Sequence, residues 1–282
     1  MADIAELDRP KTDAPDKVEA TLNYLADTGG VPVTLVGDYG DSDTRTGGGQ
    51  SDPHRVVIHN GRLADERFDL HHHGFSFVPH RTRITDFFDD DQLRRVYYPE
   101  MEALIKAESG AKRVVVFDHT LRTEDERLRR ERKIREVVRR VHNDYTEWSA
   151  PQRVRQIMGD EAEELLKGRF GIIQVWRPFN RPVETWPLAI ADGRSISDRD
   201  MVVTERRYPD RIGQTFATVY NPAHRWYWFP RMRPEKALVF KVYDSQREGT
   251  VRWTAHTAFD DPTSPPSPPP RESIEIRTLA FF

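Results

Sequence analysis

The chain offers imidazole and carboxylate groups for chemistry but no thiol. Its 282 residues include 10 histidines and 46 acidic residues, and cysteine is absent. This absence excludes disulfides, thiolate metal sites, iron–sulfur clusters and cysteine nucleophiles. A metal ion would have to be held by nitrogen and oxygen ligands, so histidines placed near carboxylates are the pattern of interest.

One histidine stands at such a spacing. His142 is the only histidine followed at the second position by an acid, Asp144, in the segment VHNDYT. Side chains at positions i and i+2 of a strand point to the same face, so both residues could ligate one ion. The alternative interpretation is a turn at a strand end in which Asp144 caps the backbone.

A second group lies near the C-terminus. His256 stands in the strand-like segment TAHTAF, and Arg271, with Ser273 two residues later, opens the final apolar segment SIEIRTLAFF. Double-stranded β-helix oxygenases carry their third iron ligand on the next-to-last core strand and an arginine at the start of the last. That arginine binds the distal carboxylate of 2-oxoglutarate. The spacing therefore predicts His142, Asp144 and His256 as Fe(II) ligands, with three coordination positions left for 2-oxoglutarate and O2.

The other histidines admit structural interpretations. His224, in NPAHRWYWFP, competes with His256 as the third ligand, but its aromatic surroundings favour packing or contact with substrate. The run from His71 to His73 is interpreted as a polar turn, and His119 as a hydrogen-bonded structural residue. The choice between His224 and His256 stays open at this stage.

Charge and hydropathy narrow the class of protein. The net charge is −3, from 43 basic and 46 acidic residues, which gives no global field for DNA or membrane. No run approaches the ~20 apolar residues of a membrane span, and the polar N-terminus lacks the apolar stretch of a signal peptide. We therefore expect a cytoplasmic protein that binds neither nucleic acid nor membrane.

The elements that position these residues fall into two parts. Before residue 137 the patterns predict a helix over 17–27, a strand in 32–40, a loop over 38–54, strands at 56–58 and 74–78, a helix over 91–108, a strand over 112–118 and a solvated charged segment over 124–135. After residue 137, short β-like segments alternate with Pro, Gly, Asn and Asp, with one helical interruption around 154–166. Such spacing is typical of a sandwich or barrel.

The predicted fold is therefore mainly β with flanking helices (α+β), built on a double-stranded β-helix (jelly-roll, cupin-like) core. We expect one oxygenase domain over 1–282. It comprises a flexible N-terminus at 1–16, an elaboration of helices and strands over 17–136 and the core over 137–282. The ligand candidates are far apart in sequence and must converge inside one core.

Several segments along the chain together resemble those of a known family. They are ATLNYLADTG, RVVVFDHTLR, VRRVHNDYT, QVWRPF, NPAHRWYWFPRM, ALVFKVYDS and PPRESIEIR. They resemble the hydroxylase/desaturase family of secondary metabolism, which includes the aspergillic-acid hydroxylase type, gibberellin-desaturase-like proteins and the small protein of cephamycin 7-alpha methoxylation. The resemblance covers roughly residues 20 to 282. It implies an Fe(II)/2-oxoglutarate-dependent dioxygenase that hydroxylates, desaturates or oxidatively cyclises a small natural product or amino-acid derivative.

The resemblance also suggests which residues face the substrate. Arg177 ends a strand and would either pair with an acid or reach toward a bound carboxylate, and Lys241, if turned inward, would need an anion. The remaining candidates for the pocket wall are Trp176, Asn221, His224, Trp226 and Tyr243. They suit a small molecule with a carboxylate or amide group. A homodimer is considered as the assembly, and the alternative function is a non-catalytic barrel that serves as partner or binding subunit of a biosynthetic complex.

Overall fold

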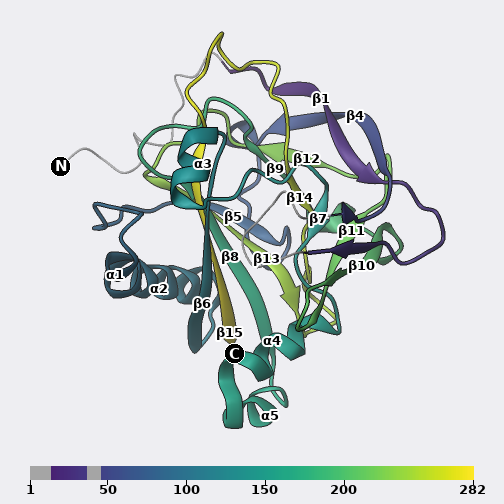
Figure 1. Ribbon diagram of the computed structural model, residues 1–282, viewed down its shortest axis with the longest axis vertical. Coiled ribbons are helices and arrows are strands. Elements are labelled where there is room, and N and C mark those ends of the chain that lie inside the picture. The colour runs from purple at the N-terminus through teal and green to yellow at the C-terminus, as the bar shows by residue number, and fades with distance from the viewer. Residues whose placement is uncertain (1–13, 37–45) are drawn as a thin grey trace.

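Two β-sheets pack on each other around one large hydrophobic cluster. The computed structural model describes residues 14–36 and 46–282, and Figure 1 shows its long strands side by side at the centre of the molecule. The ten-stranded sheet has the order β1 (Lys17–Leu25), β4 (Ser51–Asn60), β12 (Trp226–Trp228), β9 (Leu188–Ala191), β14 (His256–Ala258), β7 (His142–Asn143), β11 (Ile212–Thr218), β10 (Met201–Arg207), β2 (Val33–Leu35) and β3 (Thr46–Gly47). The five-stranded sheet has the order β5 (Phe75–Pro79), β13 (Lys236–Asp244), β8 (Phe170–Pro178), β15 (Glu272–Phe281) and β6 (Arg113–Thr123).

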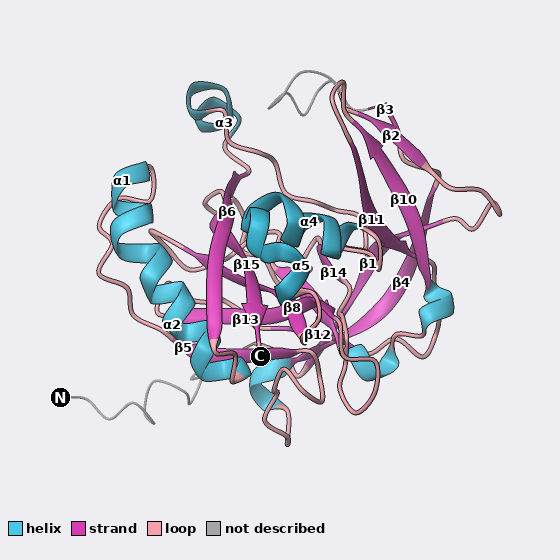
Figure 2. Cartoon of the chain, turned by 90° about the horizontal axis from the view of Figure 1, so that it is seen from below, coloured by secondary structure: helices cyan, strands magenta, loops and turns pink. Residues whose placement is uncertain are grey.

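Helices surround the two sheets, and the longest of them lies along β6 and β15 of the five-stranded sheet (Figure 2). They are α1 (Asp90–Gln92), the π-helix η4 (Leu93–Tyr97), α2 (Tyr98–Ser109), α3 (Glu126–Arg132), α4 (Ser149–Met158) and α5 (Ala162–Leu165), with short 3-10 turns at Gly61–Leu63, Gly159–Glu161, Gly193–Ser195 and Asp198–Asp200. Tyr97, Met101 and Ile105 pack on the outward side chains of β8 and β15, such as Val175 and Ile276. No helix in the described residues is long and apolar enough to cross a membrane.

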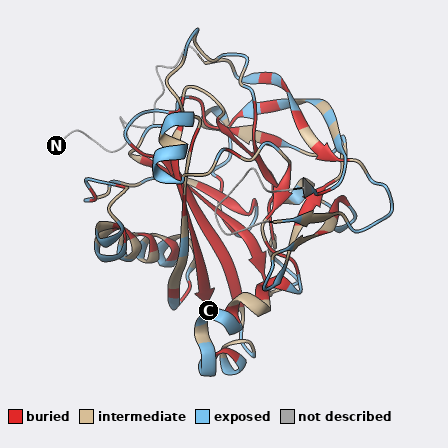
Figure 3. Cartoon of the chain, viewed as in Figure 1, coloured by how far each residue is buried: buried red, intermediate tan, exposed pale blue. Residues whose placement is uncertain are grey.

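The strands that follow residue 137 occupy the middle of both sheets. Those that precede it lie at the edges, with β5 and β6 flanking the five-stranded sheet and β1, β4, β2 and β3 extending the other. The central strands β8, β13 and β15 are buried almost throughout (Figure 3). This burial on both faces explains their continuous apolar sequence.

The predicted helix over 17–27 is wrong, because this segment is strand β1. Val18, Ala20, Leu22 and Tyr24 are buried and alternate with exposed or half-buried residues, which is the two-residue period of a strand. Strand β1 pairs with β4 along its whole length, from Lys17 opposite His59 to Leu25 opposite Ser51.

The predicted loop over 38–54 is wrong at its C-terminal end, where β3 and the start of β4 lie, while 37–45 fall outside the described residues. Residues 1–13 of the predicted flexible terminus also fall outside the described residues. The carbonyls of Pro15 and Asp16, expected in that terminus, accept hydrogen bonds from Asn60. The remaining predicted helices and strands are present near their expected positions, and β9 is a strand that the sequence patterns did not indicate.

Candidate metal centre and cosubstrate site

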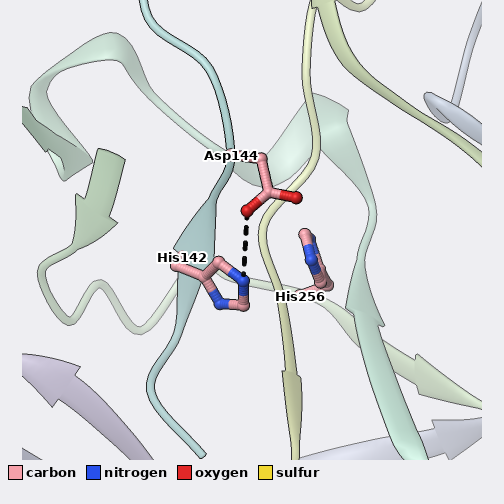
Figure 4. Close-up of side chains that lie close together, drawn as sticks. All are labelled: His142, Asp144 and His256. Carbon is pink, nitrogen blue, oxygen red and sulfur yellow. Dashed lines mark ion pairs between the residues drawn. The ribbon is translucent and has the colours of Figure 1, made fainter. Parts of the chain in front are cut away.

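Three side chains from separate segments meet inside the molecule (Figure 4). His142 of β7 pairs directly with His256 of β14 across the antiparallel ladder, and their ring centroids are 4.3 Å apart. Asp144 follows β7 immediately, and its Oδ1 lies 3.6 Å from His142 Nε2. One potential ligand atom from each residue lies within 4.8 Å of the other two, which is the spacing a single ion requires.

The protonation state of His142 favours a cation at this point. Its Nδ1 lies 2.8 Å from the carbonyl oxygen of Arg140, which can only accept, so Nδ1 carries the proton. Burial, the neighbouring His256 and Arg206 lower the pKa of His142 to about 3, so the ring is neutral at physiological pH. The lone pair of Nε2 then faces the Asp144 carboxylate, and a cation between the two atoms would relieve their repulsion.

His256 provides the clearest test of whether the residues fit an ion. Its side chain is buried, with 2% of the residue exposed, and neither ring nitrogen forms a hydrogen bond of good geometry with the described residues, although the backbone of Thr254 lies near the ring. Burial lowers the pKa of His256 to about 4, so this ring is neutral too. Because an unpaired buried polar atom costs about 1–3 kcal/mol, a ligand for one of these nitrogens is expected, and a metal ion fits.

Asp144 is held ionised by two residues that the sequence patterns did not suggest. Gln174 Nε2 donates to Asp144 Oδ2 over 2.6 Å, and Arg277 Nε lies 3.7 Å from the same oxygen. Burial alone would raise the pKa of Asp144, but the charge of Arg277 and the hydrogen bond from Gln174 lower it well below its ordinary value. Oδ1 stays directed toward His142. Both partners project from the five-stranded sheet, where Arg277 of β15 pairs with Gln174 of β8.

The predicted 2-oxoglutarate anchor lies at the start of β15. Arg271 is buried and donates through one terminal nitrogen to the carbonyl of Trp186. Its guanidinium lies 5.4 Å from the ring centroid of Trp176. Within the described part of the chain, neither Arg271 Nε nor the hydroxyl of the buried Ser273 has a hydrogen-bond partner. Orphaned donors on Arg271 and Ser273 fit the carboxylate of a bound dicarboxylic acid.

A second cation stands beside this anchor. Arg122 of β6 pairs with Ser273 across the ladder, and it donates to the carbonyl of Glu136 over 2.8 Å. Burial lowers the pKa of Arg271 to about 9, with the nearby charge of Arg122 as the next cause. An anion beside the buried Arg271 would offset the repulsion from the neighbouring Arg122, which strengthens the fit. Sequence reasoning missed Arg122, because its segment RVVVFDHTLR carries no motif of its own.

Arg177 and Lys241, which were predicted to face cosubstrate or substrate, point elsewhere. Trp176 pairs with Glu275 on the inner face of the sheet, so its neighbour Arg177 points to the helix-covered face. There Arg177 contacts His80 Nδ1 at 2.9 Å and donates to the carbonyl of Pro234. Lys241 Nζ lies 3.0 Å from Asp244 Oδ2, so the anion it needs is supplied by the protein itself.

The pocket-wall candidates Asn221, His224 and Trp226 lie together beneath β1, away from the three metal-ligand candidates. His224 Nε2 lies 3.1 Å from Asp200 Oδ2, which also accepts from the amide of Asn221. Trp226 is fully buried and donates to Tyr24 Oη over 2.8 Å. The structure thus brings His256, and not His224, to His142 and Asp144.

Tyr243 also lies outside the cavity described below. Its hydroxyl donates to Glu147 over 3.3 Å, and its ring packs near Phe170.

The histidine run forms a turn, as interpreted from the sequence. The backbone amides of His71 and His72 both donate to Asp69 Oδ1, and the buried His73 faces Glu66 at 3.1 Å. Asp192 lies near His73 and Glu66, but its carboxylate accepts hydrogen bonds from Arg194 and Arg225. Arg194 also contacts Glu66, so arginines pair with both of these carboxylates in this second histidine–acid group. His119 is hydrogen-bonded to Tyr98 Oη at 2.6 Å.

A jelly-roll with two histidines and one aspartate grouped in its interior defines the class of mononuclear iron oxygenases. Comparison with known proteins agrees. Residues 22–281 match the model of the family described as "Oxidoreductase/YMDC permease-like domain". The chain belongs to the hydroxylase/desaturase family of Fe(II)/2-oxoglutarate-dependent dioxygenases. The predicted family and enzyme class are thereby confirmed.

Individual relatives match over most of their length. The Fe(II)/2-oxoglutarate-dependent dioxygenase nvfI of Aspergillus novofumigatus is 35% identical over 81% of this chain and 84% of its own. The hydroxylase/desaturase efuI of Hormonema carpetanum is 31% identical over 94% of this chain and 95% of its own. A solved structure of the iron and alpha-ketoglutarate-dependent endoperoxidase NvfI superposes with a TM-score of 0.83, at 29% identity, over 95% of this chain and 99% of that one. This similarity confirms the predicted double-stranded β-helix.

Proposed function

We propose that the chain binds Fe(II) through His142, Asp144 and His256 and 2-oxoglutarate through Arg271 and Ser273. With them it hydroxylates, desaturates or oxidatively cyclises a small natural-product or amino-acid-derived substrate. The observation that carries the proposal is the buried, neutral His256, whose ring nitrogens form no hydrogen bond of good geometry with the described residues and which lies beside a neutral His142 and an ionised Asp144.

Each residue has a definable task in this reaction. Iron with 2-oxoglutarate, when bound, activates dioxygen for abstraction of hydrogen from a C–H bond. His142 presents Nε2 because the Arg140 carbonyl holds the proton on Nδ1. Gln174 and Arg277 hold one oxygen of Asp144 and leave the other for the metal.

The anchor and the apolar surroundings complete the arrangement. Arg271 and Ser273 supply donors for the distal carboxylate of the cosubstrate, which fixes its orientation. Phe240 packs 4.8 Å from His256, centroid to centroid, and limits the access of water to the ligand set.

An anaerobic titration with Fe(II) and 2-oxoglutarate tests the proposal. A weak visible charge-transfer band is expected for the wild type, and its loss is expected in His256→Ala. His224→Gln is the matched control and should keep the band, with melting temperature as the check on folding. If the wild type develops no band, the chain is not an Fe(II)/2-oxoglutarate enzyme, and the alternative of a non-catalytic barrel partner gains support.

A further inference from the structure

A polar cavity of about 220 Å³ adjoins the metal-ligand candidates. Asp144 and Arg277 line it, together with residues of α4 and of the β10–β11 hairpin. Helix α4 contacts β11, and both elements contribute residues to the lining. Neither Arg271 nor Ser273 lines this cavity, which separates it from the proposed cosubstrate anchor. It is therefore the space from which a substrate would approach the metal.

The cavity carries more positive than negative charge. Its two carboxylates belong to Asp118 and Asp144, and both lie near Arg277. Asp118 Oδ2 is 2.9 Å from Arg277 Nη1, and Asp144 Oδ2 is 3.7 Å from Arg277 Nε. Three further arginines line the cavity and form no ion pair with a carboxylate within residues 14–36 and 46–282. They are Arg135, Arg153 and Arg206. Arg211, also in the lining, lies 3.7 Å from Asp210.

Strand register directs Arg206 toward the metal-ligand candidates. In the β10–β11 ladder, Arg206 pairs with Gly213. Two positions further along, Thr204 pairs with Thr215, and two positions beyond that, Val202 pairs with Ala217. Ala217 in turn pairs with His142. Because paired residues share a face, Arg206 and His142 lie on the same face of the sheet.

Arg153 lines the cavity from α4. Its guanidinium lies 5.4 Å from the ring centroid of Phe117, and its buried Nε has no hydrogen-bond partner among the described residues. An unpaired donor inside a cationic cavity indicates that an acceptor is missing.

Two exposed apolar side chains also line the cavity. They are Trp148 and Ile212, with 47% and 52% of their surface exposed, and the aromatic Tyr208 is a further lining residue. Large exposed apolar side chains in a cavity lining suit a ligand whose body is apolar or aromatic.

We propose that the substrate is an organic acid with an apolar or aromatic body, and that Arg206 binds its carboxylate together with Arg153 and Arg135. Guanidinium groups bind carboxylates with charge-assisted hydrogen bonds, and here they would hold the acid near the metal. Oxidation of this acid rests on the proposed function, whereas its binding does not. A carboxylate at Arg206 could also belong to 2-oxoglutarate itself, so the test separates the two sources.

The test compares acids with their amides. Protein loaded with Zn(II) and saturating 2-oxoglutarate is titrated by calorimetry with benzoate, phenylacetate, indole-3-acetate and octanoate, and with the matching amides. At least one acid should bind tenfold or more tightly than its amide, and Arg206→Gln should abolish this preference. The guanidinium of Arg206 forms no hydrogen bond or ion pair with the described residues, so its replacement leaves no side-chain partner unpaired, and the backbone pairing of Arg206 is unaffected. Arg95→Gln, on an exposed helix position, is the control for loss of one charge.

Three outcomes overturn the proposal. The first is that no acid binds better than its amide. The second is that Arg206→Gln leaves the preference for acids unchanged. The third is that Arg206→Gln weakens 2-oxoglutarate binding as much as Arg271→Gln does. The last is read from the Fe(II) charge-transfer titration. If the wild-type protein lacks that band but still binds acids better than amides, only the proposed oxygenase function is refuted. Failure of the proposed function can therefore be told apart from failure of the proposed acid site.

Discussion

At the scale of single residues, the orientation of Asp144 depends on Gln174, which occupies the oxygen that does not face His142. We expect Gln174→Leu to weaken metal binding about 10- to 100-fold, because Oδ2 loses its neutral donor and the carboxylate can rotate. The measurement is competition of Co(II) with a chromophoric chelator. Gln156→Leu, which lines the same cavity but does not touch Asp144, is the control. Equal affinities in the two variants would rule out this role of Gln174.

Arg271 is the second residue with a measurable role. Arg271→Gln should weaken 2-oxoglutarate binding by about 2–5 kcal/mol, a loss of at least roughly thirtyfold, because one charged hydrogen-bonding partner is removed. The half-saturation concentration in the charge-transfer titration reports it. Arg181→Gln, a partly exposed arginine near Glu272, should leave that concentration unchanged. An unaltered value in Arg271→Gln would disprove the assignment.

Spacing predicted which histidines and aspartate meet, but not the residues that hold them. His142 and Asp144 stand out because no other histidine has an acid at the second position, and His256 stands out because Arg271 opens the strand-like segment that follows it. Gln174 and Arg177 lie in one continuous apolar segment, GIIQVWRPF, that is buried on both faces. Its residues show no polar–apolar alternation, so the sequence does not tell which side faces the site. This is why Arg177 was misplaced and Gln174 was missed.

At the scale of elements, strand β13 is joined to β8 by a buried ion-pair group at one end. Asp244 accepts two hydrogen bonds from Arg169, at 3.1 and 2.7 Å, and one from Lys241. Asp244→Asn would leave the buried ammonium of Lys241 without its counter-charge. We expect a loss of about 3 kcal/mol in the free energy of unfolding, measured by urea denaturation at pH 7. Asp210→Asn, at an exposed position, should cost little.

The same group predicts a dependence on acid. Burial would raise the pKa of Asp244, but Arg169 and Lys241 lower it below its ordinary value of 3.8. A carboxyl group whose folded pKa is depressed stabilises the fold above its ordinary pKa, and this contribution disappears as the pH falls through the folded value. The difference in urea midpoint between wild type and Asp244→Asn should therefore shrink below pH 4. A constant difference down to pH 2 would contradict this explanation.

Most helices and strands could be predicted from local sequence patterns, but strand β1 could not. The β-rich C-terminal half and the helix near residue 100 follow from local patterns, whereas β1 was misjudged. Its apolar residues at 18, 20, 22, 24 and 25 combine a two-residue period with one adjacent pair, which allows a helical interpretation until β4 is known to pair with it.

At the scale of the whole molecule, the proposed metal site joins β7 and β14, which lie far apart in the chain. A ligand that binds only the folded state adds RT ln(1 + [L]/Kd) to stability, about 2.7 kcal/mol at one hundred times Kd. Zn(II) with 2-oxoglutarate should therefore raise the melting temperature by several degrees. His142→Ala should show no such increase, and an equal increase in this variant would place the metal elsewhere.

The pairing of His142 with His256 also has a consequence for motion. Strand β7 has two residues and β14 has three. The middle of the ten-stranded sheet, where the ligand candidates lie, is therefore held by few backbone hydrogen bonds. Without a bound ion, the amides of this seam should exchange with deuterium much faster than those of the long neighbours β8 and β15. Metal uptake would then slow exchange at the seam selectively, so a solvent-exchange map could locate the ion without any turnover.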